Sequence, residues 1–153
     1  MTNFTVLFDI NGVLARGNWS LADDSYHPTQ PIPIELIPAG IEILKACNNS
    51  SSVLKTFGLT NCTQQHITFL HRHVPELTFE LNGIIAAGSL AWKKPNYKAF
   101  LFASHAYKLD PHTCIFIDDS PINIEAANNF GMIGILFDES VKVMAQLVEL
   151  GAI

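Results

Sequence analysis

Five short apolar runs, rich in β-branched or aromatic residues, recur along the chain and constrain its fold more than any other feature. They cover residues 4–8, 52–59, 83–87, 114–117 and 132–137. Their hydrophobicity is continuous rather than alternating, which is the pattern that a strand covered on both faces requires. Segments with helical spacing lie between or after them, at residues 38–47, 63–73, 96–108, 122–130 and 140–150. This alternation predicts an α/β protein: a three-layer, Rossmann-like open parallel sheet of five strands with helices on both faces.

A chain of 153 residues is the size of one ordinary domain, so we expect a single domain over residues 1–153. Residues 15–38 break the alternation, because they hold four prolines and show no clear periodicity. They are predicted to form a short irregular loop or lid over the carboxyl end of the first strand. Trp19 and Tyr26 in this segment either touch a substrate or pin the loop to the body.

Composition and charge exclude several classes of partner. Apolar residues make up 48% of the chain and charged residues 15%, with no apolar run near the length of a membrane span, so no membrane segment is expected. The net charge of −5 has the wrong sign for binding a nucleic-acid backbone. Met1 leads into an apolar run without a secretory signal, which favours a cytoplasmic location. The widely spaced Cys47, Cys62 and Cys114 are expected to be reduced and to act as small apolar residues.

Polar side chains end three of the predicted strands and precede one helix, and ligand sites in open α/β sheets lie at this edge. Three of them, Asp9, Asp118 and Asp119, are carboxylates that would repel one another unless they were protonated or bound a metal. Hard oxygen ligands of this kind suit Mg²⁺. The sequence therefore predicts a bound divalent cation at this edge.

The remaining polar groups at this edge suit a phosphate group. Lys94 supplies a compact positive charge, Thr60 and Asn61 supply polar side chains, and the turn after Asp9 exposes backbone N–H groups. A carboxylate at Asp9 can attack phosphorus and form an aspartyl phosphate when the phosphate's charge is screened by the cation and Lys94.

Four sequence segments carry a family resemblance: FDINGVL at 8–14, GLTN at 58–61, KKPN at 93–96 and FIDDSPINIEAANNFGM at 116–132. Their order resembles the four motifs of the haloacid dehalogenase-like (HAD) superfamily, over essentially the whole chain. The resemblance implies a HAD-like core with strand order 5-4-1-2-3 and Asp9 as nucleophile. It further implies Thr60 and Lys94 as phosphate ligands, Asp119 as a direct Mg²⁺ ligand, and Asp118 as a ligand either directly or through water.

Asn11 departs from the pattern that this resemblance implies. Phosphatases of the superfamily usually place a second Asp two residues after the nucleophile, where it protonates the leaving oxygen and later activates water. An amide at Asn11 cannot perform this general acid-base step, which typically contributes about 10²- to 10⁴-fold to the rate. The resemblance assigns the metal contact at this position to the backbone carbonyl, which Asn11 retains. We therefore expect weakened acid-base catalysis with metal binding preserved, and aryl or acyl phosphates to be affected least.

Simpler structural interpretations remain open for several of these residues. Thr60 and Asn61 could cap the following helix, and the Asp118–Asp119 pair could complement a helix N-terminus. The histidines at 66, 71 and 73 are not four residues apart, so they are expected to lie on a mostly solvated helix face rather than to bind metal.

The leading functional prediction is a Mg²⁺-dependent hydrolase, a phosphatase acting on a small-molecule or macromolecular phosphate ester. The alternatives are a catalytically impaired binding or regulatory module and a phosphotransferase. A 2-haloacid dehalogenase is less favoured, because its attack on carbon does not need the metal for which this site is built. Residues 15–38 are too few for a full cap domain, so the site is expected to be open or to be closed by a neighbouring subunit of a homo-oligomer.

Overall fold

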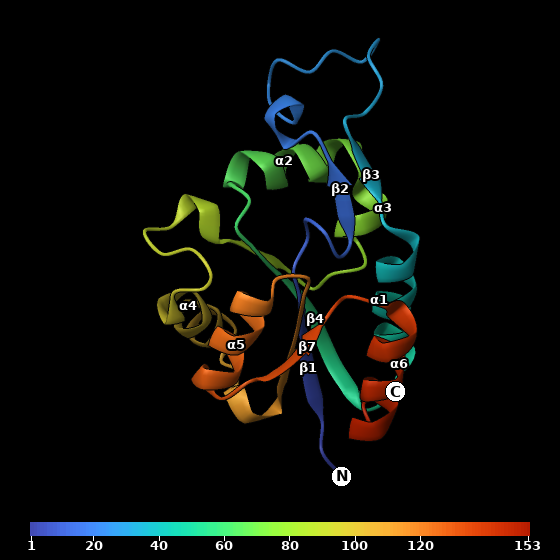
Figure 1. Ribbon diagram of the computed structural model, residues 1–153. Helices are drawn as coiled ribbons and strands as arrows, with labels where there is room; N and C mark the ends of the chain where they lie inside the picture. The colour runs from blue at the N-terminus through green and yellow to red at the C-terminus, as the bar shows by residue number, and fades with distance from the viewer.

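A five-stranded parallel sheet forms the centre of the molecule (Figure 1). The computed structural model describes every residue from 1 to 153. The sheet strands are β1 (Phe4–Phe8), β4 (Val53–Thr60), β5 (Ile84–Ala86), β6 (Cys114–Asp118) and β7 (Ile133–Leu136). Every pair of neighbours in this sheet is parallel. The predicted α/β class and the five-stranded parallel sheet are thus confirmed.

The order of the strands across the sheet is β5-β4-β1-β6-β7. The labels differ from the expected 5-4-1-2-3 because β2 and β3 belong to a separate hairpin that the sequence prediction did not include. When only the five sheet strands are counted along the chain, the order reads 5-4-1-2-3 from the β7 edge. β1 lies at the centre, so the residue that follows it is placed in the middle of the carboxyl edge.

Helices cover both faces of this sheet, as the continuous apolar runs predict (Figure 1). Val6 and Phe8 of β1 pack in one core with the buried side chains of α1 (Pro38–Asn49) and α6 (Ser140–Leu150). Leu7 faces the opposite way, into a second core with α4 (Tyr97–Tyr107) and α5 (Pro121–Phe130). The two faces of β1 are therefore both buried, which is why its sequence shows no alternation.

Further helices lie beyond the carboxyl edge of the sheet or in its connections. α2 (Gln64–His73) was predicted, whereas the one-turn α3 (Pro75–Thr78) was not, because four residues are too few to show a helical period. The short 3₁₀ helices are η1 (Trp19–Leu21), η2 (Ala87–Ser89) and η3 (Pro111–Thr113). No helix has the length and apolar character needed to cross a membrane.

Residues 15–37, here called the lid, are more regular than predicted. Their two ends pair as an antiparallel hairpin of β2 (Ala15–Gly17) and β3 (Ile34–Leu36), and η1 follows β2. The prediction of an irregular segment was wrong at these ends, since strands of three residues are too short to show a pattern. The middle of the lid contains only turns and bends.

The lid packs along one face of α2. Tyr26 contacts Phe69 and His73 with ring centroids 5.3 and 4.7 Å apart, and Trp19 lies 5.6 Å from His66 in an edge-to-face arrangement. The expectation that the histidines occupy a solvated face was therefore wrong for His66 and His73, which the lid half-covers. Their spacing of seven residues places them two turns apart on the same side of the helix.

The three cysteines match their predicted state. Cys47, Cys62 and Cys114 are all free and buried. Burial raises the pKa of the Cys47 thiol to about 12 and that of Cys114 to about 11, so both remain protonated near neutral pH. These two side chains act as small core residues.

Candidate active site

Asp9 is the first residue beyond β1, and it is buried at the carboxyl edge of the sheet with 7% of its surface exposed. Oδ1 accepts a hydrogen bond from the Ile10 N–H at 2.9 Å and lies 3.0 Å from the Lys94 ammonium. Oδ2 makes no hydrogen bond, and it is not fully buried. One oxygen is thus fixed by the protein while the other remains accessible, as a nucleophile requires.

The turn after Asp9 is closed by its own backbone. The Ile10 carbonyl accepts hydrogen bonds from the N–H groups of Val13, Leu14 and Ala15. Gly12 has φ of +93°, a left-handed conformation that favours glycine. Asn11 is exposed at this turn, and its carbonyl oxygen accepts no hydrogen bond. That carbonyl is therefore free to bind a cation, and its role as a metal ligand stays a prediction.

Asp118 ends β6 next to Asp9 and is fully buried. Its Oδ1 accepts a hydrogen bond from the Ser120 N–H at 2.9 Å. Its Oδ2 accepts from the Lys94 ammonium at 2.9 Å and from the Asn123 amide at 3.0 Å. These three donors occupy most of the acceptor capacity of the carboxylate. The Asp118 side chain is consequently held in one orientation.

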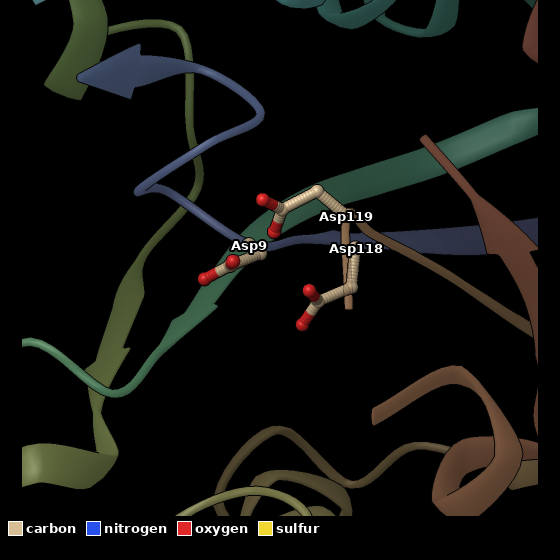
Figure 2. Close-up of side chains that lie close together, drawn as sticks. All are labelled: Asp9, Asp118 and Asp119. Atoms are coloured by element: carbon tan, nitrogen blue, oxygen red, sulfur yellow. The ribbon is translucent and has the colours of Figure 1, made fainter. Parts of the chain in front are cut away.

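Asp119 is the more available member of the acidic pair. It is exposed, and its carboxylate lies directly against Gly12, where the Cβ of any other residue would collide with Oδ2. A larger residue at position 12 would force this carboxylate to move from its present position. The oxygen atoms that Asp9, Asp118 and Asp119 can offer all lie within 4.8 Å of one another, and Figure 2 shows the three side chains gathered at the ends of β1 and β6. This spacing and this oxygen-only donor set fit a small divalent cation.

Lys94 lies beneath the carboxylates rather than at the cavity surface. It is 4% exposed, whereas its neighbour Lys93 is exposed. Besides its contacts with Asp9 and Asp118, its ammonium donates a hydrogen bond to the Leu59 carbonyl at 2.7 Å. All three N–H donors of Lys94 are therefore engaged by protein groups in this arrangement.

Thr60 ends β4 beside this lysine, and Asn61 follows the strand. The buried Thr60 hydroxyl accepts a hydrogen bond from the Cys62 N–H at 3.1 Å. Asn61 forms two hydrogen bonds of 2.9 Å with the backbone N–H and carbonyl of Lys94. The interpretation of this pair as helix caps was wrong, because the N-cap of α2 is Thr63. Asn61 instead fixes the loop that carries Lys94.

The acidic cluster carries a strong electrostatic cost. Burial raises the pKa of the Asp9 carboxyl from 3.8 to about 7; the ammonium of Lys94 opposes this rise, and the charge of Asp118 adds to it. The pKa of Asp119 is also raised, first by partial burial and then by the neighbouring Asp118 carboxylate. A cation bound among these groups would relieve this cost, since it favours their ionised forms.

A cavity of about 360 Å³ opens over these carboxylates. Besides Asp9, Asn11, Thr60, Asn61, Asp118 and Asp119, its lining includes Trp19, Cys62, His66, Ser120 and Asn123. The sequence prediction missed His66 because its place in the lining depends on how α2 packs against the lid and the sheet edge, which no local pattern shows. Trp19 packs on α2 and therefore pins the lid to the body; it also lines the cavity, and its contact with a substrate stays a prediction.

Solved structures provide the comparison with known proteins, whereas no model of a protein family matches the chain. A HAD-superfamily hydrolase from Ehrlichia chaffeensis aligns with a TM-score of 0.72 and 17% identity, covering 98% of this chain and 98% of that one. The chain has a HAD-like fold.

Two further structures share this HAD-like fold. A HAD-superfamily hydrolase of subfamily IA, variant 1, from Geobacter sulfurreducens aligns over 95% of this chain and 100% of its own, with a TM-score of 0.68 and 12% identity. A HAD family enzyme from Bacteroides thetaiotaomicron, in complex with magnesium and inorganic phosphate, covers 88% of this chain and 93% of its own, with a TM-score of 0.63 and 14% identity. At these identities the similarity establishes the fold alone.

Proposed function

We propose that the protein is a Mg²⁺-dependent hydrolase of phosphate monoesters in which Asp9 is the nucleophile. The observation that carries this proposal is the difference between the two oxygens of Asp9. Oδ1 is held by the Ile10 N–H and Lys94, while Oδ2 is unpaired and accessible. Burial among other carboxylates raises the pKa of Asp9 to about 7, and such perturbed groups are typical of functional sites rather than of packing. The HAD family enzyme that binds magnesium and phosphate supports the same chemistry by analogy of fold.

The cation site would be formed by Asp9, Asp119 and the backbone carbonyl of Asn11. Asp119 is the direct ligand because its carboxylate is exposed beside the cavity, whereas Asp118 is already occupied by three donors and acts through water or a remaining lone pair. A bound Mg²⁺ would screen the phosphate charge and favour the ionised form of Asp9.

In the proposed reaction, Oδ2 of Asp9 attacks phosphorus and a new O–P bond forms. The bond from phosphorus to the leaving oxygen breaks, and its electron pair stays on that oxygen. Lys94 holds Oδ1 and partly neutralises Asp9 and Asp118, so its role here is to orient the nucleophile; Thr60 offers its hydroxyl proton to a phosphate oxygen. Water then hydrolyses the aspartyl phosphate.

Asn11 reaches the cavity but makes no side-chain hydrogen bond. Its amide can donate a hydrogen bond to the leaving oxygen but cannot transfer a proton at neutral pH. The proposal therefore includes slow turnover of alkyl esters, and a preference for substrates whose leaving group departs as a stable anion.

The test is a phosphatase assay with and without Mg²⁺ on the wild-type protein, Asp9→Asn and Asn11→Asp. We expect activity that requires both Mg²⁺ and Asp9, and an increase of up to about 10²-fold in Asn11→Asp because the missing acid is restored. The affinity for Mg²⁺, measured by calorimetry, should be similar in the wild type and Asn11→Asp. Mg²⁺ binding without turnover in any of the three proteins would instead identify a binding or regulatory module.

A further inference from the structure

The cavity over the carboxylates has two walls of different origin. Asp9, Thr60 and the acidic pair come from the ends of the sheet strands, whereas Trp19 comes from the lid and His66 from the first turn of α2. Figure 1 shows the lid and α2 beyond the carboxyl edge of the sheet. A phosphate group seated against Asp9 would therefore direct its ester substituent away from the sheet, towards Trp19 and His66.

The hydrogen bonds of His66 determine which of its ring nitrogens carries the proton. Nδ1 lies 3.2 Å from the backbone N–H of Thr63, and the Thr63 hydroxyl accepts from the His66 N–H in return, so the two residues form a capping box. A backbone N–H can only donate, so Nδ1 must be the acceptor. In the neutral ring the proton therefore lies on Nε2.

This Nε2–H group is available to a ligand. It makes no hydrogen bond in the structure, and the Nε2 atom is not fully buried. As part of the cavity lining, His66 can thus donate a hydrogen bond to a ligand through Nε2.

Trp19 supplies the adjoining surface. Its indole lies 5.6 Å from the imidazole with the ring planes inclined by 63°, an edge-to-face contact that helps to fix both rings. The indole N–H is buried and has no partner. Because the indole N–H is buried, the His66 Nε2–H is the donor that a ligand can reach, and an aromatic wall beside it suits a planar substituent that carries its acceptor at the ester oxygen.

We propose that Trp19 and His66 form the leaving-group subsite, in which the Nε2–H of His66 donates a hydrogen bond to the leaving oxygen of an aryl phosphate. The inference rests on the proposed phosphatase function. As the bond from Asp9 Oδ2 to phosphorus forms, the leaving oxygen keeps the electron pair of the broken bond and takes its proton from water. His66 stabilises the negative charge on that oxygen without transferring a proton, which partly offsets the inability of Asn11 to act as an acid.

The test is the dependence of kcat/KM on the pKa of the leaving phenol, measured with Mg²⁺ on a series of substituted phenyl phosphates. His66→Phe keeps an aromatic ring beside Trp19 but removes the donor. We expect its kcat/KM to fall about tenfold for the least acidic phenols and much less for the most acidic ones, which need little stabilisation. The line relating log kcat/KM to phenol pKa should therefore become steeper.

Thr63→Ala is the matched control, since it weakens the same end of α2 but leaves the imidazole and the Thr63 backbone N–H in place. It should give a line parallel to that of the wild type. Inorganic phosphate, which has no leaving group, should inhibit the wild type and His66→Phe with the same Ki. Parallel lines for His66→Phe, equal effects of the two variants or a weaker phosphate Ki in His66→Phe would each overturn the inference while leaving the phosphatase function intact. A wild-type protein that hydrolyses none of the series would overturn the proposed function itself.

Discussion

Replacing the nucleophile should stabilise the metal-free protein, because the ionised Asp9 is a buried charge that the fold tolerates at a cost. The carboxyl is expected to titrate at 3.8 in the unfolded chain and at about 7 in the folded protein. Below about pH 4 it is protonated in both states, so its burial has no electrostatic cost there. As the pH rises, the unfolded chain ionises first and stability is lost until the folded carboxyl has also ionised.

The size of this loss follows from the separation of the two values. Because folding raises the pKa of this carboxyl from 3.8 to about 7, the ionised carboxyl destabilises the folded protein by about 4 kcal/mol at pH 8. Asp9→Asn keeps an oxygen for the Ile10 N–H and for Lys94, but the ammonium loses one of its two negative neighbours. This loss offsets part of the gain, so we expect a net stabilisation of about 2 kcal/mol at pH 8.

Urea denaturation in EDTA at pH 8 and pH 4 measures this effect, with Asp24→Asn as a control carboxylate on the exposed lid. Asp9→Asn should be more stable than the wild type at pH 8, and the difference should shrink towards zero or reverse at pH 4. Asp24→Asn should change stability little at either pH. A variant that is less stable than the wild type at pH 8, or an advantage that does not depend on pH, would refute the electrostatic reasoning.

Three further predictions concern the surroundings of Asp9. Lys94→Met should lower the free energy of unfolding by about 3 kcal/mol at pH 8 in urea titrations, because it leaves Asp9 and Asp118 buried without their shared cation; no loss would show that the ion pairs are weak. Gly12→Ala should weaken Mg²⁺ binding in calorimetry, since the new methyl group displaces the Asp119 carboxylate; unchanged affinity would show that the ion does not depend on the present position of this carboxylate. The rise in Tm on adding Mg²⁺ should increase from pH 5 to pH 8, as protons leave carboxyls whose pKa values are raised; a constant rise would place the ion elsewhere.

The sheet was predictable because the local sequence of each strand is enough to show that the strand is buried. The runs at 4–8 and 114–117 are apolar at every position or nearly so, and the structure covers them on both faces. The polar residue after each run then necessarily lies at the carboxyl edge, which is how Asp9 and Asp118 were brought together. Ser120 and Gly131 bound α5 as N-cap and C-cap, in the way that their residue types predict.

Features that depend on contacts distant in sequence were not predictable. The lid hairpin gains its order from pairing across 15–17 and 34–36 and from packing on α2, neither of which leaves a periodic signal. Asn61 looks like a helix cap in sequence, but its partner is the backbone of Lys94, 33 residues away. His66 lines the cavity beside Trp19, a lid residue that lies far from it in the sequence.

The central claim, that Asp9 accepts the phosphoryl group, is tested most directly by mass spectrometry of protein quenched in acid during turnover of an aryl phosphate with Mg²⁺. We predict that the wild-type protein carries one phosphoryl group on the peptide that contains Asp9, and that this modification is absent from Asp9→Asn and from protein treated with EDTA. Mg²⁺-dependent hydrolysis that persists in Asp9→Asn, or a phosphoryl group found on another residue, would contradict the claim.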